Sequence, residues 1–374
     1  MRSLSGYSEK EQRRRCSMQM INIYIKALFK KLSRFSKHPY FGFVVFGIAL
    51  VIAQLLSMGG ILSQSVMTSF VLTMIYSVVA LGFALLLGYA GLASLGTAGF
   101  VGLGTYLIGH FSGTLGYPLI LTLLISLGGA VLLGVIVGFI SLRIEGMYLA
   151  IITLGLAEIM KEVFKSFSAF TNGVNGLSFR DFNIFGIAIS ANAVNFIVII
   201  VFILMIVATL NIIKSPTGRA FLAMKNSDSA AQSMGIALLK YRLIAFIIAT
   251  LYAVIGGMLY MINQEFSIPQ KWSLDFSLNI LAAVIVGGAQ SVTGIILGTF
   301  MIFGLNSAVL QNIDFFVQNP SATWILNGTL IIVVIMFYPG GLIRLLKTIV
   351  YKVKGWYLQL RHLWRIYRYG QDSK

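Results

Sequence analysis

Residues 61–87 read ILSQSVMTSFVLTMIYSVVALGFALLL, a stretch without a single charged side chain. A helix that spans a bilayer needs about 20 consecutive, mainly apolar residues, so this stretch predicts a transmembrane helix. The whole chain of 374 residues is 58% hydrophobic and only 10% charged, whereas soluble proteins carry about 25% charged residues. The sequence therefore predicts an all-α polytopic membrane protein and excludes a soluble globular domain and a disordered chain.

Further apolar segments follow on both sides of this stretch, and together they predict about ten spans. The expected spans are 40–58, 61–87, 88–111, 119–140, 147–166, 191–213, 243–262, two within 276–311, and 322–338. The stretch 276–311 is broken by glycines, which predicts a short segment, a tight turn and a further span. Ten crossings place both termini on the same side of the membrane.

The charge distribution indicates which side that is. The chain carries 28 Lys and Arg against 11 Asp and Glu, with basic residues concentrated in 1–39, 214–242 and 342–374. Cytoplasmic loops of membrane proteins are enriched in Lys and Arg, so these three segments are expected on the cytoplasmic face. This pattern explains the net charge of +17 without nucleic acid as a partner.

Three regions follow from this distribution. The sequence predicts a cytoplasmic basic amphipathic arm at residues 1–39 and the transmembrane domain at residues 40–341. It predicts a cytoplasmic basic amphipathic helix at residues 342–374. Basic amphipathic helices lie on anionic membrane surfaces, which makes membrane lipid the expected partner of both tails. Docking of the tails onto a partner protein is the alternative.

The residue inventory argues against an enzyme. The single Cys16 excludes an internal disulfide and a cysteine-based metal cluster, and no metal site is expected. Ser94 and His110, a conceivable intramembrane nucleophile and base, are separated by about 24 Å along a continuous helix. The chain also has no Gly-x-x-x-x-Gly-Lys-Ser/Thr phosphate loop, so it is expected to hold no cofactor and to hydrolyse no ATP by itself.

Glycine clusters in two of the apolar segments. These clusters indicate either tight helix packing or discontinuous helices whose free backbone groups line a polar path. The path hypothesis selects Gly91, Ser94, Gly96 and Thr97 in the first cluster and Gly287 and Gly288 in the second.

Ionisable residues inside spans are functional candidates because they are costly to bury in a bilayer. The span 147–166 carries such a set in Glu158, Lys161, Glu162 and Lys165. Their i,i+3 spacing predicts ion pairs along one helix. A wall or gate of a transport pathway is the alternative, and Glu158 is its deepest candidate.

Segment 214–246 links two spans on the predicted cytoplasmic face. A short helix is expected after Pro216-Thr217-Gly218, and a second near Asp228, which can cap it. Ala230 and Ala231 would form a small flat surface, and Gly235 would end the turn. Such a helix suits docking into the cleft of a partner protein.

The arrangement Asp228-Ser-Ala230-Ala231 followed by Gly235 resembles the coupling loop of ABC importer permeases. The segments around it are similar to the larger, M-type permease subunit of Liv-type branched-chain amino acid importers. The similar segments, in family order across about 88–342, are Gly88-Tyr89-Ala90-Gly91-Leu92-Ala93-Ser94-Leu95-Gly96, Arg143-x-x-Gly146-x-Tyr148-x-Ala150-Ile151-x-Thr153-Leu154, Glu158-Ile159, Thr171-Asn172-Gly173-x-x-Gly176-Leu177, Ser215-Pro216-x-Gly218-Arg219, Lys240-Tyr241-Arg242-Leu243-x-Ala245-Phe246 and Pro339-x-Gly341-Leu342. The chain departs from the family pattern at Asp228, Asn172 and Thr97, where Glu, Gly and His are usual.

The resemblance implies a permease that translocates branched-chain or related amino acids across the bacterial inner membrane. ATP would be used by two separate ATP-binding cassette subunits, which would dock at Asp228, Ala230, Ala231, Gly235 and Arg219. A second homologous permease subunit would complete the path, and a periplasmic or surface binding protein would deliver the solute. Urea and short-amide importers share the family, so such a solute is one alternative. A stand-alone secondary transporter is the other.

Overall fold

The computed structural model describes residues 41–60, 63–141, 147–178, 183–184, 187–188, 191–305, 313–337, 340–346, 348, 351–352 and 355–356. The chain divides into two compact units, Met1–Ile52 and Ala53–Lys374. Of the first unit, the described residues are the beginning of helix α2 (Phe41–Met58). The predicted arm 1–39 and most of the predicted tail helix 342–374 lie outside the described residues.

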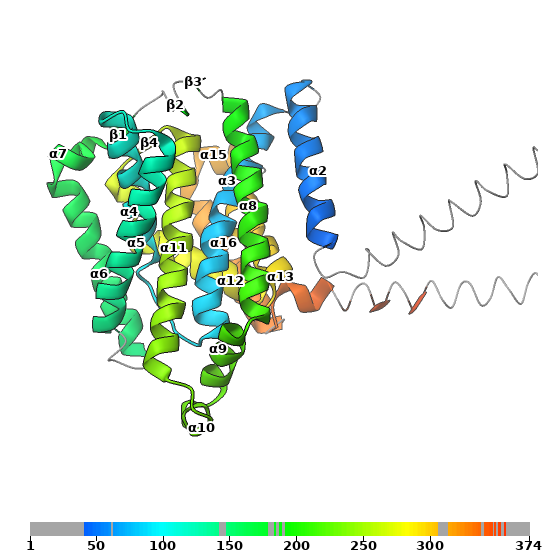
Figure 1. Cartoon of the computed structure of the whole chain (residues 1–374). Helices are drawn as coiled ribbons and strands as arrows, with labels where there is room; N and C mark the ends of the chain where they lie inside the picture. Colours follow the sequence, from blue (N-terminus) through cyan, green and yellow to red (C-terminus); the bar gives the residue numbers. More distant parts are fainter. Residues whose placement is uncertain are drawn as a thin grey trace, which may run out of the picture. The chain divides into compact units, whose positions relative to one another are not determined.

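The second unit is built mainly of helices (Figure 1). Its long helices are α3 (Gln64–Ala84), α5 (Leu119–Ser141), α6 (Met147–Ser166), α8 (Ala191–Lys214), α11 (Leu238–Gln264) and α16 (Pro320–Phe337). The shorter helices are α4 (Thr97–Ile108), α7 (Ser168–Thr171), α9 (Pro216–Asn226), α10 (Asp228–Ser233), α12 (Leu274–Gly287), α13 (Val292–Thr299) and α15 (Asp314–Gln318). Three π-helical segments continue α3, α4 and α13, namely η1 (Leu85–Tyr89), η2 (Gly109–Thr114) and η5 (Phe300–Gly304).

The remaining elements are short. Two 3₁₀ turns, η3 (Gly173–Asn175) and η4 (Pro269–Lys271), follow α7 and β4. Strand β1 (Leu177–Ser178) pairs antiparallel with β4 (Phe266–Ser267), in the register Leu177↔Ser267. Strands β2 (Asn183–Ile184) and β3 (Ile187–Ala188) form a second antiparallel pair.

The predicted helical segments agree with this element order. Span 147–166 coincides with α6, and the broken stretch 276–311 contains α12, a turn at 288–291 and α13, as expected. Four helices of the described residues are long and apolar enough to cross a bilayer, namely Gln64–Tyr89, Leu119–Ile140, Asn192–Lys214 and Leu238–Gln264. The prediction was wrong for the third span, because residues 90–96 are not helical and α4 begins at Thr97.

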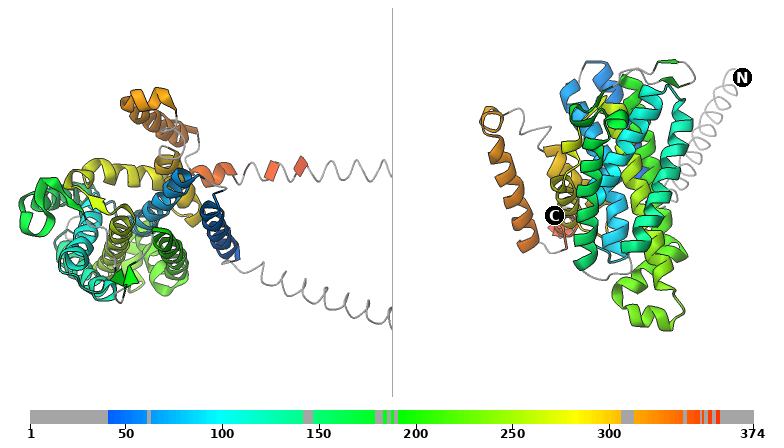
Figure 2. Two further views of the ribbon diagram at one scale, coloured as in Figure 1. Left: turned by 90° about the horizontal axis from the view of Figure 1, so that it is seen from above. Right: turned by 90° about the vertical axis from the view of Figure 1, so that its left-hand side faces the viewer.

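Helix α11 packs along α3, α4 and α5 in the interior of the second unit. Small residues allow this close approach. A β-carbon at Gly257 would lie 1.9 Å from the carbonyl oxygen of Val101 in α4, and one at Gly82 would lie 2.2 Å from Cβ of Tyr252 in α11. Figure 2 shows these helices end-on in its left view. Part of the glycine content is therefore explained by tight helix packing.

The connections gather at the two ends of these helices. The α8–α11 connection, which contains α9 and α10, projects at one end, whereas α7 and the β1–β4 pair lie at the other (Figure 1). Helix α11 runs from the first end to the second. The predicted docking loop is thus separated from the β1–β4 end by the length of a spanning helix.

Candidate functional site: the α9–α10 loop and the interrupted helices

Helix α9 begins at its capping residue. The Ser215 side chain accepts a hydrogen bond from the backbone N–H of Gly218 at 3.3 Å, and Pro216 takes the first helical position. Proline suits that position because its missing N–H would have no partner there. The helix therefore starts at Pro216, three residues before the predicted start after Gly218.

Helix α10 is capped by Ser227, so the prediction that Asp228 caps it was wrong. The Ser227 hydroxyl accepts from the N–H of Ala230 at 3.3 Å. Asp228 stands one residue later and its carboxylate pairs with Arg242 of α11, with 2.5 Å between Oδ2 and Nη2. An acidic residue in the first turn also complements the helix dipole. The pair fixes α10 to the beginning of α11.

The exposed tip of α10 differs from the predicted two-alanine surface. Ala230 is exposed, but Ala231 is 1% exposed and packs inward, so a bulky residue there would disturb α10 itself. The side chain of Met234, which follows α10 directly, is 80% exposed. Gly235 ends the turn with a φ of +79°, as predicted. The accessible apolar surface therefore consists of Ala230 and Met234.

Arg219 does not join this tip. It lies exposed on α9, and its Nη1 donates to the carbonyl oxygen of Lys214 at 3.3 Å, at the end of α8. A cation is favourable at a helix C-terminus. In the described structure, Arg219 therefore holds the α8–α9 corner.

The residues Ser94, Gly96 and Thr97 meet at the beginning of α4. Ser94 and Thr97 line a small, partly open cavity of about 10 Å³, room for about one water molecule. Its other lining residues are Phe83, Leu86, Phe100, Phe246, Ala249, Thr250 and Ala253. Apart from its hydroxyls, the cavity is lined by apolar groups.

Hydroxyl groups from other helices satisfy the backbone around this helix start. The N–H of Leu95 donates to Thr153 Oγ1 of α6 at 2.9 Å, and the N–H of Ala98 donates to Ser277 Oγ of α12 at 3.0 Å. A helix N-terminus leaves N–H groups without intrahelical partners. The interrupted segment 90–96 thus sits where α4, α6 and α12 converge.

The glycines Gly91, Gly287 and Gly288 lie elsewhere. Gly91 has a φ of +74° and ends the α3–η1 helix. A β-carbon at Gly287 would lie 2.2 Å from the carbonyl oxygen of Gly294, and one at Gly288 would lie 3.0 Å from that of Gly340. Tight packing therefore explains Gly287 and Gly288.

The end of η1, where the first helix is interrupted, nevertheless contacts the α12–α13 turn, where the second is interrupted. A β-carbon at Gly88 would lie 2.0 Å from the carbonyl oxygen of Ala289, so the backbone of η1 rests against the α12–α13 turn. The Tyr89 hydroxyl also donates to the carbonyl oxygen of Gln290 at 2.8 Å. Sequence reasoning identified two broken segments in the two halves of the chain, and the fold brings them into contact.

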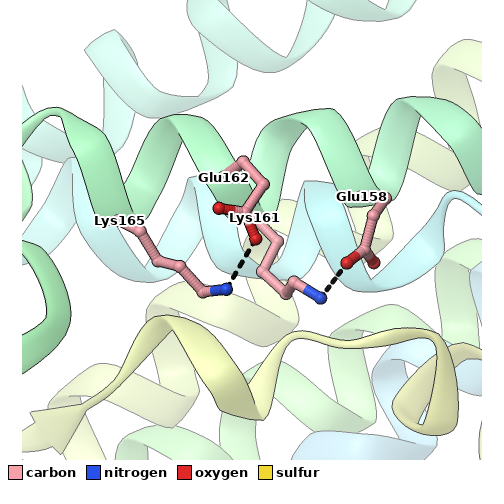
Figure 3. Close-up of polar contacts among 4 residues, drawn as sticks. All are labelled: Glu158, Lys161, Glu162 and Lys165. Carbon is pink, nitrogen blue, oxygen red and sulfur yellow. Dashed lines mark hydrogen bonds and ion pairs between the residues drawn. The ribbon is translucent and has the colours of Figure 1, made fainter.

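Glu158 belongs to the predicted ladder of ion pairs along α6 (Figure 3). Lys161 pairs with Glu158, and Lys165 pairs with Glu162 at 2.6 Å. The side chains of Glu158 and Glu162 are 48% and 57% exposed and line a shallow surface hollow with Ile159, Val163 and Ser166. The ladder is confirmed, and it faces outward from the helices that surround the cavity.

Lys271 was not singled out by sequence reasoning. It lies in η4, in the connection between α11 and α12, and its Nζ donates to the Tyr260 hydroxyl at 2.5 Å and lies 4.4 Å from the centre of that ring. Burial lowers the pKa of Lys271 from 10.5 to about 8. Its partial burial depends on the packing of the fully buried Trp272 and of Tyr260, which the sequence alone does not reveal.

This lowered pKa predicts a pH-dependent stability. Below pH 8 the lysine is protonated in both the folded and the unfolded chain, and the folded chain bears the cost of burying the charge. Between about pH 8 and pH 10.5 the folded chain loses its proton first, so stability from this group should rise with pH. Apparent melting temperatures in detergent should therefore rise more with pH for the wild type than for Lys271→Met; parallel curves would contradict the assignment.

Comparison with known proteins gives consistent matches. Residues 65–335 match the family described as "Branched-chain amino acid transport system / permease component". The high-affinity branched-chain amino acid transport system permease protein LivM of Escherichia coli (strain K12) is 26% identical over 304 residues, which cover 74% of this chain and 69% of that protein. LivM of Salmonella typhimurium (strain LT2) is 27% identical over the same length and coverage. No solved structure gives a significant match.

Proposed function

The chain belongs to the family of permease components of branched-chain amino acid transport systems, and from this premise we propose that it forms one half of the solute path of an ATP-driven importer. Membership makes it a multi-pass membrane transport subunit without a catalytic role of its own. The proposal concerns its partners, its solute and the residues that act in transport.

The observation that carries the proposal is the exposed tip of the α9–α10 loop. Ala230 and the 80% exposed Met234 project from a loop that the Asp228–Arg242 pair fixes to α11. An exposed apolar group that a partner protein buries contributes to the binding energy of the interface. We assign this tip, together with Gly235, as the contact of an ATP-binding cassette subunit, and Arg219 as the residue that orients the loop.

The membrane topology of the proposal has ten crossings with both termini in the cytoplasm. Segment 214–242, which contains the connection between α8 and α11, carries five basic residues and one acidic residue, which supports a cytoplasmic location. The coupling segment 214–242 then faces the ATPase subunits. The basic regions 1–39 and 342–374 would rest on the lipid surface of the same side, flanking the transmembrane domain 40–341.

For the pathway, we propose the neighbourhood of Ser94, Gly96 and Thr97, with Gly91 and Gly288 at the ends of the interrupted helices. Free backbone groups at discontinuous helices are common at transport sites. The outward-facing Glu158 would contact the second, homologous permease subunit or line the path between the two, because lipid solvates exposed carboxylates poorly. Gly287 would support the α12–α13 turn.

The proposed solute is a branched-chain or related amino acid, delivered by a binding protein outside the membrane. The mainly apolar surroundings of the cavity support a permease that selects weakly and leaves selection to that binding protein. Urea or a short amide is the alternative solute within the family. A secondary transporter normally needs intramembrane ion ligands, and the carboxylates of α6 are already paired with lysines.

Affinity purification of the tagged protein in mild detergent tests this assignment. We expect mass spectrometry to find a second polytopic subunit and ATP-binding cassette subunits, and the preparation to hydrolyse ATP. A monodisperse single species without ATPase activity would contradict the proposal and favour a secondary transporter.

A further inference from the structure

The junction between α9 and the end of the α3–η1 helix carries an inference that rests on the proposed function. The helix ends at Gly91, where Leu92 N–H donates to the carbonyl oxygen of Leu86 at 3.0 Å. The last carbonyl groups of a helix have no partner further along it. Gly88 carries one of these carbonyl groups.

Two side chains from different parts of the chain donate to the Gly88 carbonyl oxygen. Lys225 of α9 reaches it with Nζ at 2.6 Å, and Gln290 of the α12–α13 turn reaches it with Nε2 at 3.3 Å. An ammonium group is favoured at this position because the C-terminus of a helix carries partial negative charge. One carbonyl oxygen therefore joins the coupling loop to both interrupted membrane segments.

Parts of this junction are closely packed, whereas Lys225 as a whole remains exposed. The aliphatic part of Lys225 lies over Gly91, where a β-carbon would be 3.2 Å from its Cγ. The backbone of Gly88 rests against Ala289, and α9 is anchored by the buried Phe221 and Met224. Because α9 passes directly into α10 through Ser227, a displacement of α10 moves the base of Lys225 as well.

We propose that Lys225 is the positioning residue through which movement of the coupling loop reaches the two interrupted helices. When an ATPase subunit shifts α10, the lysine pulls on or releases the Gly88 carbonyl group, and the α12–α13 turn follows through Gln290. Lys225 itself touches neither solute nor nucleotide. It sets the relative position of η1 and the turn during transport.

The test compares Lys225→Met with Lys225→Arg in the complete transporter. Methionine keeps the length of the side chain but removes the donor, whereas arginine keeps both the charge and the donor. For Lys225→Met we expect solute uptake to fall about tenfold while ATPase activity stays within about twofold and the melting temperature is unchanged. Lys225→Arg should recover at least half of the uptake.

Other outcomes overturn the inference. Unchanged uptake in Lys225→Met would show that the residue does not transmit movement of the loop. A parallel loss of uptake and ATPase activity would place Lys225 in the docking surface instead. If Lys225→Met yields no folded protein, the residue serves to stabilise the fold instead of transmitting movement. Absence of ATP-dependent uptake in the wild type would refute the proposed function itself, which separates the two failures.

Discussion

Replacement of Gly257 by alanine is expected to reduce the yield of folded, monodisperse protein at least about fivefold. The added β-carbon would lie 1.9 Å from the carbonyl oxygen of Val101 and 3.0 Å from the amide nitrogen of Thr105, so α11 and α4 would have to separate. Overpacking typically costs about 1–3 kcal/mol, and backbone atoms give way less than side chains. The same separation would break the hydrogen bond from the Thr105 hydroxyl to the Gly257 carbonyl group, now 3.1 Å long. Size-exclusion chromatography with a fluorescent tag measures the yield.

Gly155→Ala is the matched control for this substitution. Gly155 lies within α6, and no atom is found within 4 Å of its added β-carbon. Alanine there should be neutral or slightly stabilising, because glycine in a helix costs roughly 0.5–1 kcal/mol relative to alanine. Equal yields of the two variants would mean that α11 and α4 are not packed through Gly257.

Met234→Asp should lower uptake at least about tenfold and deplete the ATPase subunits from the purified complex. The side chain is 80% exposed, so the change leaves the fold intact, but it places a charge at the centre of the proposed contact with the ATPase. Central apolar anchors carry a large part of the binding energy of an interface. Quantitative mass spectrometry of the complex, normalised to the permease, measures the depletion.

Val174→Asp provides the comparison for Met234→Asp. Val174 is an apolar residue of η3, beside α7 at the opposite end of the helices, and is 60% exposed. This variant should retain the ATPase subunits at the wild-type level. The assignment of α10 as the docking site would be wrong if Met234→Asp also retained them.

Long apolar stretches made most of the helices predictable. Helix α5 (Leu119–Ser141) follows the predicted span 119–140 closely, because a bilayer-length apolar run leaves few other structures possible. The break at 90–96 was not placed correctly. Its residues are apolar or small, and the segment is held by contacts from a distant element, such as the hydrogen bond from the Leu95 N–H to Thr153 Oγ1.

The details of the coupling loop depended on tertiary contacts in the same way. The motif correctly indicated a short helix and its glycine end, but it did not reveal that Ala231 faces inward or that Asp228 is paired with Arg242. From the sequence, Lys225 was only one of the basic residues of a predicted cytoplasmic loop, because its partner, the Gly88 carbonyl group, lies 137 positions away. A local pattern specifies which element forms, whereas its contact surface depends on what packs against it.

The departure at Asn172 has a local explanation in the structure. The residue adopts a φ of +60°, and its side-chain amide donates to the carbonyl oxygen of Gly176 at 2.9 Å. Asparagine tolerates this left-handed conformation better than most residues. It can therefore stand where the family usually has glycine without a change of turn.

Uptake of labelled leucine into proteoliposomes tests the central claim most directly. The purified complex would be reconstituted with its binding protein, with ATP supplied on the side of α10. We predict accumulation that requires ATP, that isoleucine and valine suppress, and that excess urea or acetamide leaves unchanged. Accumulation driven by an ion gradient without ATP, or ATP-dependent uptake of urea without leucine, would contradict the account.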